Sequence, residues 1–353
     1  LEGDGGVIEV SGSQVDHKAT GVARANAGVS GDGGTVRVVT NQKTHIAGRL
    51  SAVGGEQAGN GGLIETRSNK VLDIDPSARI QAGAGSIQGQ TGSWLLSLEQ
   101  MNMDAGAAGV VSRTLNQANV RIEARSAGCF ESGGCSGDVV GNLEFGADAH
   151  ILKQAGPATT LALLADNTFI NRGEIGGTAG VLLHLSVQAK DVILNAGSSV
   201  TANRVEMRSA ESMIGAGRIN GVGDRASVDL LAKLIEFSGV IDVSNRSGQG
   251  GVIRVQANDM AFRRESWLDA SGRDGGSIRL VARDGEGRIV LDGAVLQADG
   301  GAGSGGVIAL AGDQSTLISD ATLTAEGTGH GGRILIGRDG SEGTVPFLSL
   351  IHI

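Results

Sequence analysis

Gly61-Gly62-Leu63-Ile64-Glu65-Thr66 shows the pattern that decides the fold of this chain: two glycines, then a strand of alternating character. The pattern recurs along the sequence, with copies that begin at Gly5, Gly33, Gly61, Gly250, Gly275, Gly305 and Gly331. The separations are 28 and 28 residues in the first cluster, and 25, 30 and 26 residues in the second. Such spacing indicates a repeat architecture.

A second short strand of the form Leu-x-Ala lies 17 to 21 residues after the first glycine of a pair. It occurs as Leu50-Ser51-Ala52, Ile80-Gln81-Ala82, Leu268-Asp269-Ala270, Leu296-Gln297-Ala298 and Leu323-Thr324-Ala325. Alternate side chains of a strand share a face, so Ile253 and Val255 are expected on one face and Val252 and Arg254 on the other. A unit of about 25 residues cannot bury its apolar face alone, so the units must stack. The sequence predicts an all-β fold, a parallel β-solenoid and most simply a right-handed parallel β-helix.

Glycine and proline usage fits this prediction. The chain has 60 glycines and three prolines, and we expect the glycines at strand ends to provide sharp turns with positive φ. Collagen is excluded because glycine is not every third residue. Disorder is disfavoured because hydrophobic residues alternate regularly and make up 40% of the chain.

The repeats divide the chain into four parts. Regular repeats are expected in residues 1–95, and less regular coils with a cysteine-containing loop in 96–245. Regular repeats return in 246–340, and 341–353 form an atypical tail that we interpret as truncated or foreign sequence. The chain begins inside a repeat without an initiating Met, so we interpret it as a fragment or an internal piece.

One segment of the middle part allows two interpretations. Residues 227–237 could form a short amphipathic helix or two strands around a corner. The β-branched and aromatic residues and the flanking glycines favour the strands.

Charge and composition argue against several classes of function. The net charge is −9, the pI is about 5.2, and no basic run exceeds Arg263-Arg264, which disfavours nucleic-acid binding. Aromatic residues make up 2% of the chain and tyrosine is absent, so stacking platforms for sugars are few. The apolar stretches are too short to cross a bilayer, and we predict no transmembrane segment.

Cys129 and Cys135 are the two cysteines and enclose a loop of five residues. In an exported protein they would form a disulfide that staples this loop. The alternative is two unpaired thiols in a surface loop. A metal site is disfavoured because no histidine or further cysteine lies nearby, and we predict no metal or other cofactor.

Two glycine-rich motifs resemble ligand sites. Residues 301–306 match G-x-G-x-x-G, but Val307-Ile308-Ala309-Leu310 continues as a strand where a dinucleotide site needs a helix, so we predict a turn. Asp4, Asp32 and Asp274 lie beside glycines, but not at the nine-residue period of calcium-binding repeats. We therefore predict no calcium site.

Asp73 and Asp75 are two residues apart and could serve as a carboxylate pair in polysaccharide cleavage. Pro76 indicates instead that Asp75 ends a strand. Five of the six histidines, at 17, 45, 150, 184 and 330, are scattered along the chain without a visible Ser or Asp partner set. The sequence therefore predicts no catalytic residues.

Three further positions have a structural or a chance explanation. Trp94 and Trp267 are most simply large residues that fill the core or a coil junction. Asn245-Arg246-Ser247 is a glycosylation sequon that chance explains equally well.

Four submotifs carry a family resemblance across residues 1–100: 50–55, 59–66, 71–74 and Thr91-Gly92-Ser93-Trp94-Leu95-Leu96. Their order and spacing resemble the repeat module of filamentous-haemagglutinin-like exoproteins, among them the high-molecular-weight adhesins of two-partner secretion in Gram-negative bacteria. The units in 250–340 fit the same pattern. In the family Trp-Leu-Leu is commonly followed by Asp-Pro, whereas Ser97-Leu98-Glu99 stands here. The family's amino-terminal secretion domain, with its Asn-Pro-Asn signatures, has no counterpart in these residues.

The resemblance implies a non-enzymatic, adhesive shaft of a secreted surface protein with a role in virulence. Its implied partners are an outer-membrane barrel transporter, which would act on the family's amino-terminal domain, and a receptor on a host or bacterial surface. Two alternatives stay open. One is a β-helical polysaccharide lyase or hydrolase, which requires acidic and basic side chains clustered in a groove on one sheet. The other is the shaft of a contact-dependent toxin-delivery protein.

Overall fold

The computed structural model describes residues 3–125, 141–178, 180–337 and 349–351. It is almost entirely parallel β-structure, a β-solenoid of about 12 turns with 3% helix. The parallel β-helix that the glycine pairs predict is therefore confirmed. The chain divides into two compact units, Leu1–Gln188 and Ala189–Ile353. Cys129 and Cys135 lie outside the described residues, and their disulfide stays a prediction.

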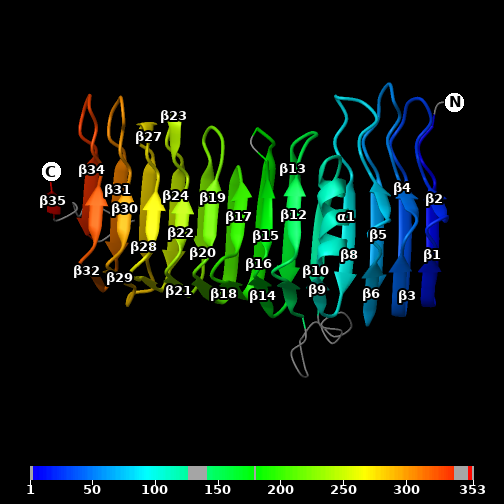
Figure 1. The fold of residues 1–353 in the computed structure, drawn as a ribbon, viewed down its shortest axis with the longest axis horizontal. Coiled ribbons are helices and arrows are strands. Elements are labelled where there is room, and N and C mark those ends of the chain that lie inside the picture. Colours follow the sequence, from blue (N-terminus) through cyan, green and yellow to red (C-terminus); the bar gives the residue numbers. More distant parts are fainter. Residues whose placement is uncertain (1–2, 126–140, 179, 338–348, 352–353) are drawn as a thin grey trace. The chain divides into compact units, whose positions relative to one another are not determined.

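In the first unit each coil places strands at up to three positions, and strands at the same position pair in parallel (Figure 1). The first position, directly after the glycine pair where one is present, holds β1 (Val7–His17), β3 (Thr35–Ile46), β5 (Leu63–Ser68), β8 (Ser93–Leu98), β10 (Asn119–Ala124), β13 (Thr159–Ala165) and β16 (Leu183–Leu194). The second holds β6 (Val71–Ile74), β9 (Met101–Met103), β11 (Leu143–Phe145) and β14 (Thr168–Asn171). The third holds β2 (Val22–Arg24), β4 (Arg49–Ser51), β7 (Arg79–Gln81), β12 (His150–Lys153) and β15 (Glu174–Gly177).

The second unit repeats this arrangement. Its first position holds β18 (Arg204–Gly215), β20 (Ser227–Leu231), β24 (Val252–Ala257), β28 (Ser277–Ala282), β31 (Val307–Gly312) and β34 (Arg333–Gly337), and its second holds β21 (Leu234–Phe237), β25 (Asp259–Phe262), β29 (Arg288–Asp292) and β32 (Ser315–Ser319). The third holds β17 (Ser199–Ala202), β19 (Arg218–Gly221), β22 (Val240–Asp242), β26 (Trp267–Asp269), β30 (Val295–Gln297) and β33 (Thr322–Thr324). The Leu-x-Ala strands are third-position strands, and residues 227–237 form two strands, as predicted.

Within the residues that the structure describes, three short strands lie outside this scheme. In the excursions after the third position, β23 (Asn245–Gln249) pairs in parallel with β27 (Gly272–Asp274). In the atypical tail, β35 (Ser349–Ile351) pairs with β34 and runs antiparallel to it.

The core consists of columns of apolar side chains that repeat from coil to coil. In the first unit the register aligns Val36, Ile64, Trp94, Val120 and Leu161, and each of them is at most 1% exposed. In β24 Ile253, Val255 and Ala257 are buried, whereas Val252 and Arg254 face outward, as the alternation predicts. Stacked strands lie about 4.8 Å apart, so each apolar side chain packs against its equivalents above and below.

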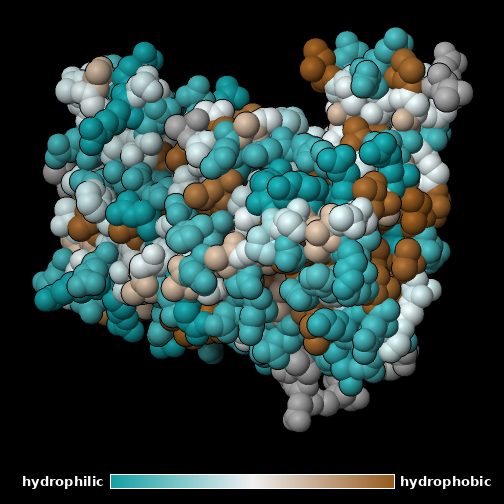
Figure 2. Space-filling view, turned by 45° about the vertical axis from the view of Figure 1, so that its right-hand side comes forward, coloured by the Kyte–Doolittle hydropathy of each residue, from teal (hydrophilic) through white to brown (hydrophobic). Residues whose placement is uncertain are grey.

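Apolar side chains of the first coil are exposed where those of later coils are covered by a neighbouring coil. Val7 and Val22 are 73% and 58% exposed, although both belong to strands. Figure 2 shows apolar side chains gathered on the side of the molecule that carries β1 and β2. A strand side chain at this level lacks the contacts that a neighbouring coil supplies, which is why it stays exposed.

Most of the paired glycines allow close backbone approach, and none of the pairs that precede a first-position strand provides the positive φ that the sequence suggested. The positive-φ glycines of the described residues lie elsewhere, for example Gly31 and Gly59. A Cβ on Gly62 would lie 2.0 Å from the carbonyl oxygen of Gly34 in the preceding coil. The Gly62 amide donates to the Ala52 carbonyl at 2.8 Å, which closes the base of the loop between them. The same closing bond joins Gly34 to Ala25, Gly92 to Ala82, Gly276 to Ala270, Gly306 to Ala298 and Gly332 to Ala325.

A ladder of side-chain acceptors runs through the loops of the first unit. Asp4 Oδ1 accepts from the Asp32 amide at 2.8 Å, and Asp32 Oδ1 accepts from the Asn60 amide at 2.7 Å. Asn60 Oδ1 in turn accepts from the Gln90 amide at 2.8 Å. These side chains satisfy backbone donors of the next coil, where no strand can do so. They hold the loops in register.

Helix α1 (Ala105–Leu115) is an element that the sequence did not predict. It follows β9 and takes the place of a third-position strand in its coil (Figure 1). Asp104 caps its amino terminus, since Asp104 Oδ1 accepts from the Ala107 amide at 2.8 Å. The side chains of Val110, Val111 and Leu115 are buried against the coil interior.

The helix satisfies the strand edges on either side of it. Gln117, just after the helix, donates from Nε2 to the Ile80 carbonyl of β7 at 3.1 Å. Ser112 Oγ accepts from the Leu152 amide of β12 at 2.9 Å. Polar side chains thus replace the ladder hydrogen bonds that a strand would have supplied to both edges.

Lys153 closes the carboxyl end of α1. Its side chain is fully buried, and Nζ donates to the carbonyls of Leu115 at 2.8 Å and Ala155 at 2.7 Å. Thr159 Oγ1 also donates to Leu115 O, at 2.9 Å. Burial lowers the pKa of Lys153 from 10.5 to about 8. A neutral amine still has two N–H donors for these two carbonyls.

This pKa predicts an alkaline gain in stability. Between pH 8 and 10.5 the unfolded chain binds a proton at Lys153 that the folded chain lacks, so the free energy of unfolding rises with pH. We expect a contribution of up to about 3 kcal/mol, complete near the unfolded pKa. Urea unfolding at about pH 7 and about pH 10 measures it, with Lys153→Met as the reference that removes only this titration. An equal pH dependence in the Met variant would contradict the assignment.

Candidate functional site

The sequence motifs that resemble ligand sites have structural roles in the loops of the solenoid. Residues 301–306 form a turn that leads into strand β31, as predicted for a structural G-x-G-x-x-G. Asp4 and Asp32 are acceptors in the loop ladder, and Asp274 Oδ1 accepts from the Ser304 amide at 3.2 Å. Within the described residues, no group of three or more His, Cys, Asp or Glu side chains could hold a metal ion.

The two carboxylates Asp73 and Asp75 do not work as a pair. Strand β6 ends at Ile74, and Asp75 Oδ1 accepts from the Ser77 amide at 2.7 Å in the turn that follows. Hydrogen bonds from Ser77 lower the pKa of Asp75. This is a turn-capping carboxylate, consistent with Pro76 as a strand terminator.

His45 has aspartate partners that the sequence did not reveal. The register of β1, β3 and β6 aligns Asp16, His45 and Asp73 on three successive coils. His45 Nδ1 lies 2.9 Å from Asp16 Oδ1, and its Nε2 lies 3.9 Å from Asp73 Oδ2. Hydrogen bonds from Lys18 and His45 lower the pKa of Asp16. The column is a partly exposed row of polar side chains along the three coils.

The two tryptophans have different environments. Trp94 is fully buried and donates from Nε1 to Thr66 Oγ1 at 3.1 Å, as expected of a core residue. Trp267 is 46% exposed, so the core, one of the two places expected for it, is wrong. At the sequon, Asn245 Nδ2 donates to Asp224 Oδ1 at 3.1 Å.

A groove on the outer face of the second unit gathers most of the exposed charge of its first-position strands. It has a volume of about 590 Å³. It is lined from β18, β20, β24 and β28 and by one residue just after β28, namely by Arg204, Glu206, Arg208, Asp229, Leu230, Leu231, Arg254, Val255, Gln256, Arg279, Val281 and Arg283. We call it the arginine groove.

Strand register builds this groove. The pairing aligns Glu206 with Asp229, Asp229 with Arg254, and Arg254 with Arg279. Alternation turns this row outward while Met207, Leu230, Val255 and Leu280 of the same strands are buried. Neighbouring members of the row are therefore about 4.8 Å apart along the solenoid.

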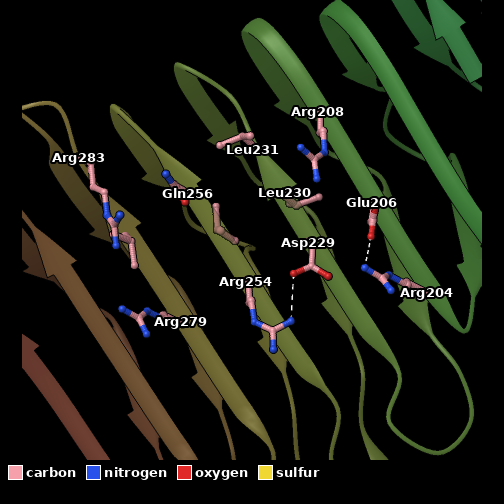
Figure 3. A pocket seen from close by; sticks show the side chains of 12 residues that line it. Arg204, Glu206, Arg208, Asp229, Leu230, Leu231, Arg254, Gln256, Arg279 and Arg283 are labelled. Atoms are coloured by element: carbon pink, nitrogen blue, oxygen red, sulfur yellow. Dashed lines mark hydrogen bonds and ion pairs between the residues drawn. The ribbon is translucent and has the colours of Figure 1, made fainter. Parts of the chain in front are cut away.

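The electrostatics of the groove are basic. Arg254 Nη1 lies 3.2 Å from Asp229 Oδ1, and Arg204 forms an ion pair with Glu206 (Figure 3). The lining holds five arginines and two carboxylates, which is a net charge of +3 (5 − 2) in a chain of net charge −9. Figure 3 shows the five guanidinium groups distributed along neighbouring strands, so the groove presents a line of donors rather than a single point charge.

Such a line of guanidinium groups can bind an extended anionic ligand. Arginine stays protonated at all physiological pH values and donates in a planar fork that matches carboxylate and sulfate oxygens. Part of the signal was present in the sequence, since Arg254 and Arg279 occupy the same position after their glycine pairs. Arg204, Arg208 and Asp229 follow no glycine pair, so only the three-dimensional register brings them beside the other two.

Comparisons with protein-family models, with curated proteins and with solved structures give no match. The resemblance to filamentous-haemagglutinin-like exoproteins therefore stays a prediction that rests on the submotifs of residues 1–100. Among the described residues, no helix is both long and apolar enough to span a membrane.

Proposed function

We propose that this chain is part of the adhesive shaft of a secreted bacterial surface exoprotein, and that it binds acidic polysaccharide through the arginine groove. The observation that carries the proposal is the row Glu206, Asp229, Arg254 and Arg279 with its flanking arginines. Stacked coils suit a shaft because each coil is stabilised by its neighbours and the exposed rows repeat along the axis.

An acidic polysaccharide fits the groove better than a nucleic acid. The ligand must carry regularly spaced anionic groups, because the arginines follow the strand spacing. The lining residues include no aromatic side chain on which a base could stack, and the chain as a whole is acidic. Weak contacts with single sugars would add along the polymer.

Export and location follow from the resemblance. We propose the outer-membrane barrel transporter of two-partner secretion as the export partner, acting on an amino-terminal domain of the family type. The receptor side is a host-cell or bacterial surface that displays the polysaccharide.

Binding of the unmodified chain to heparin and to polygalacturonate tests the proposal, with dextran as the neutral control. We expect both acidic polymers to bind and dextran not to bind. Between about 50 and about 200 mM salt the affinity is expected to fall about 10- to 50-fold, because bound counterions are released. Equal binding of dextran, preference for duplex DNA, or affinity independent of salt would contradict it.

A second function is favoured by the same groove. A polysaccharide lyase or hydrolase requires acidic and basic side chains on one sheet, and Glu206, Asp229 and the arginines meet that description. Arginine is always protonated, so the base would have to be one of these carboxylates, and each of the two is ion-paired with an arginine. Incubation with polygalacturonate separates the two functions, because cleavage releases reducing ends and simple binding does not.

A further inference from the structure

A second groove of the second unit lies along its third-position strands. It has a volume of about 470 Å³. Its lining includes Trp267 and Asp269 of β26, Asp242 and Val240 of β22, and Arg218 of β19. We call it the tryptophan groove. Its residues play no part in the arginine groove.

Trp267 provides an exposed, oriented aromatic surface. The residue is 46% exposed, although tryptophan is among the most costly side chains to leave in water. Its Nε1 donates to Gln297 Oε1 at 3.0 Å, which restrains the ring. The register places Val240 and Val295 on either side of it, so the ring stands between two apolar neighbours.

A pair of aspartates stands beside the ring. Asp242 and Asp269 are register partners on adjacent strands, about 4.8 Å apart. Each uses Oδ1 to accept a turn amide, from Ser244 at 2.9 Å and from Ser271 at 2.8 Å. Within the described residues no hydrogen bond engages the other oxygen of either carboxylate. The second oxygens of Asp242 and Asp269 can therefore accept hydrogen bonds from donors on a ligand.

The charges of the groove select an uncharged ligand. Arg218 and Arg246 balance Asp242 and Asp269, and the fifth charged residue of the lining, Asp299, is engaged by Thr324 Oγ1 at 2.9 Å and by the Glu326 amide at 2.7 Å. An anionic ligand would meet the carboxylates without the surplus of arginines that the arginine groove has. A ligand with hydroxyl donors and one apolar face fits both the ring and the carboxylates.

We infer that the tryptophan groove is a binding site for a neutral sugar, with a pyranose ring stacked on Trp267 and two of its hydroxyls donating to Asp242 and Asp269. Arg218 and Arg246 donate to ring or hydroxyl oxygens at the rim. The site does not depend on the proposed function, because none of its residues lines the arginine groove.

Tryptophan fluorescence tests the inference directly. The chain has two tryptophans, and Trp94 is fully buried, so a ligand that stacks on Trp267 changes the emission of that ring alone. Cellobiose, lactose and chitobiose are the probes, and sialyllactose is the anionic comparison. We expect a saturable change with at least one neutral disaccharide at a Kd on the order of 1 mM, and weaker binding of sialyllactose. No saturable change with any of the three neutral probes would overturn the inference.

Variants locate the binding, with titration calorimetry as a readout that needs no fluorophore. Trp267→Ala is expected to bind the sugar about tenfold more weakly, or about 1.4 kcal/mol. Asp269→Asn keeps an oxygen for the Ser271 amide and is expected to weaken binding several-fold. Thr322→Ala changes an exposed residue in the same register column outside the groove and is the matched control. Unchanged affinity in both Trp267→Ala and Asp269→Asn would overturn the inference even if a sugar binds.

Discussion

Gly62→Ala is expected to lower the free energy of unfolding of the first unit by about 3 kcal/mol, whereas Gly6→Ala should leave it almost unchanged. Both are second glycines of a Gly-Gly pair that precedes a first-position strand. A Cβ at Gly62 would lie 2.0 Å from the Gly34 oxygen and 2.6 Å from the Gly33 carbonyl carbon. A Cβ at Gly6 would meet no atom within 4 Å.

The size of the effect follows from what the alanine methyl would displace. The obstructing atoms at Gly62 are backbone atoms of a neighbouring coil, which no rotamer change can move aside. Shifting that coil would also strain the bond from the Gly62 amide to the Ala52 carbonyl, which closes the loop. At Gly6 the alanine methyl has open space, and alanine additionally lowers the entropy of the unfolded chain.

Urea unfolding of the two variants beside the unmodified chain measures the difference. In the second unit, Gly306→Ala and Gly331→Ala repeat the comparison, because a Cβ at Gly306 would lie 2.1 Å from the Gly276 oxygen and one at Gly331 would meet nothing within 4 Å. If Gly6→Ala lost as much free energy of unfolding as Gly62→Ala, and Gly331→Ala as much as Gly306→Ala, close backbone approach would not be what these glycines provide.

These glycines also show how far the sequence could lead. Their spacing predicted the coils and the parallel stacking, because a period of about 25 to 30 residues with an alternating strand leaves few other folds. The reason for the glycines was predicted wrongly. Contacts between Gly62 and Gly34 depend on how closely two coils approach, and a pattern within one repeat does not contain that distance.

Helix α1 was missed for a local reason. Gly106 and Gly109 lie within its first turns, and glycine is a poor helix former. Tertiary contacts decide the outcome instead, since Arg113 Nη2 donates to the Pro76 carbonyl at 2.6 Å and Ser112 bonds the edge of β12. The one sequence signal was Asp104, a residue type that often caps the start of a helix. It lacks the Glu or Gln three residues later that completes a capping box, because Ala107 stands there.

Only part of the arginine groove, the two arginines that follow glycine pairs, could be predicted from the sequence. Aligned repeats place Arg254 and Arg279 at the same outward position, so a basic stripe was open to prediction there. The tryptophan groove was missed, although the alternation around Leu268 already places Trp267 on the outer face, because the pairing of Asp242 with Asp269 depends on the register between coils. The position of Trp267 at the start of β26 puts it on the outer face, and only Leu268 is buried in that strand.

The double variant Arg254→Glu and Arg279→Glu is expected to weaken binding of heparin and polygalacturonate by at least about 100-fold, or about 2.8 kcal/mol. These two residues form the continuous basic half of the row, and their reversal places four acidic side chains at successive coils from Glu206 onward. The groove then repels the polymer it was proposed to bind, and the affinity that remains should lose its dependence on salt.

The control for this variant carries the same change in net charge. Arg24→Glu and Arg333→Glu reverse two exposed arginines on β2 and β34 that do not line the groove. Its affinity should stay within about threefold of that of the unmodified chain, because neither arginine lines the groove and salt screens exposed charges that do not contact the polymer. Melting curves of both variants show whether the coils stay folded, since Arg254→Glu places a second carboxylate beside Asp229 and adds repulsion on an exposed face. Equal weakening in the two double variants would mean that net charge, and not the row of arginines along β24 and β28, governs attraction to the polymer.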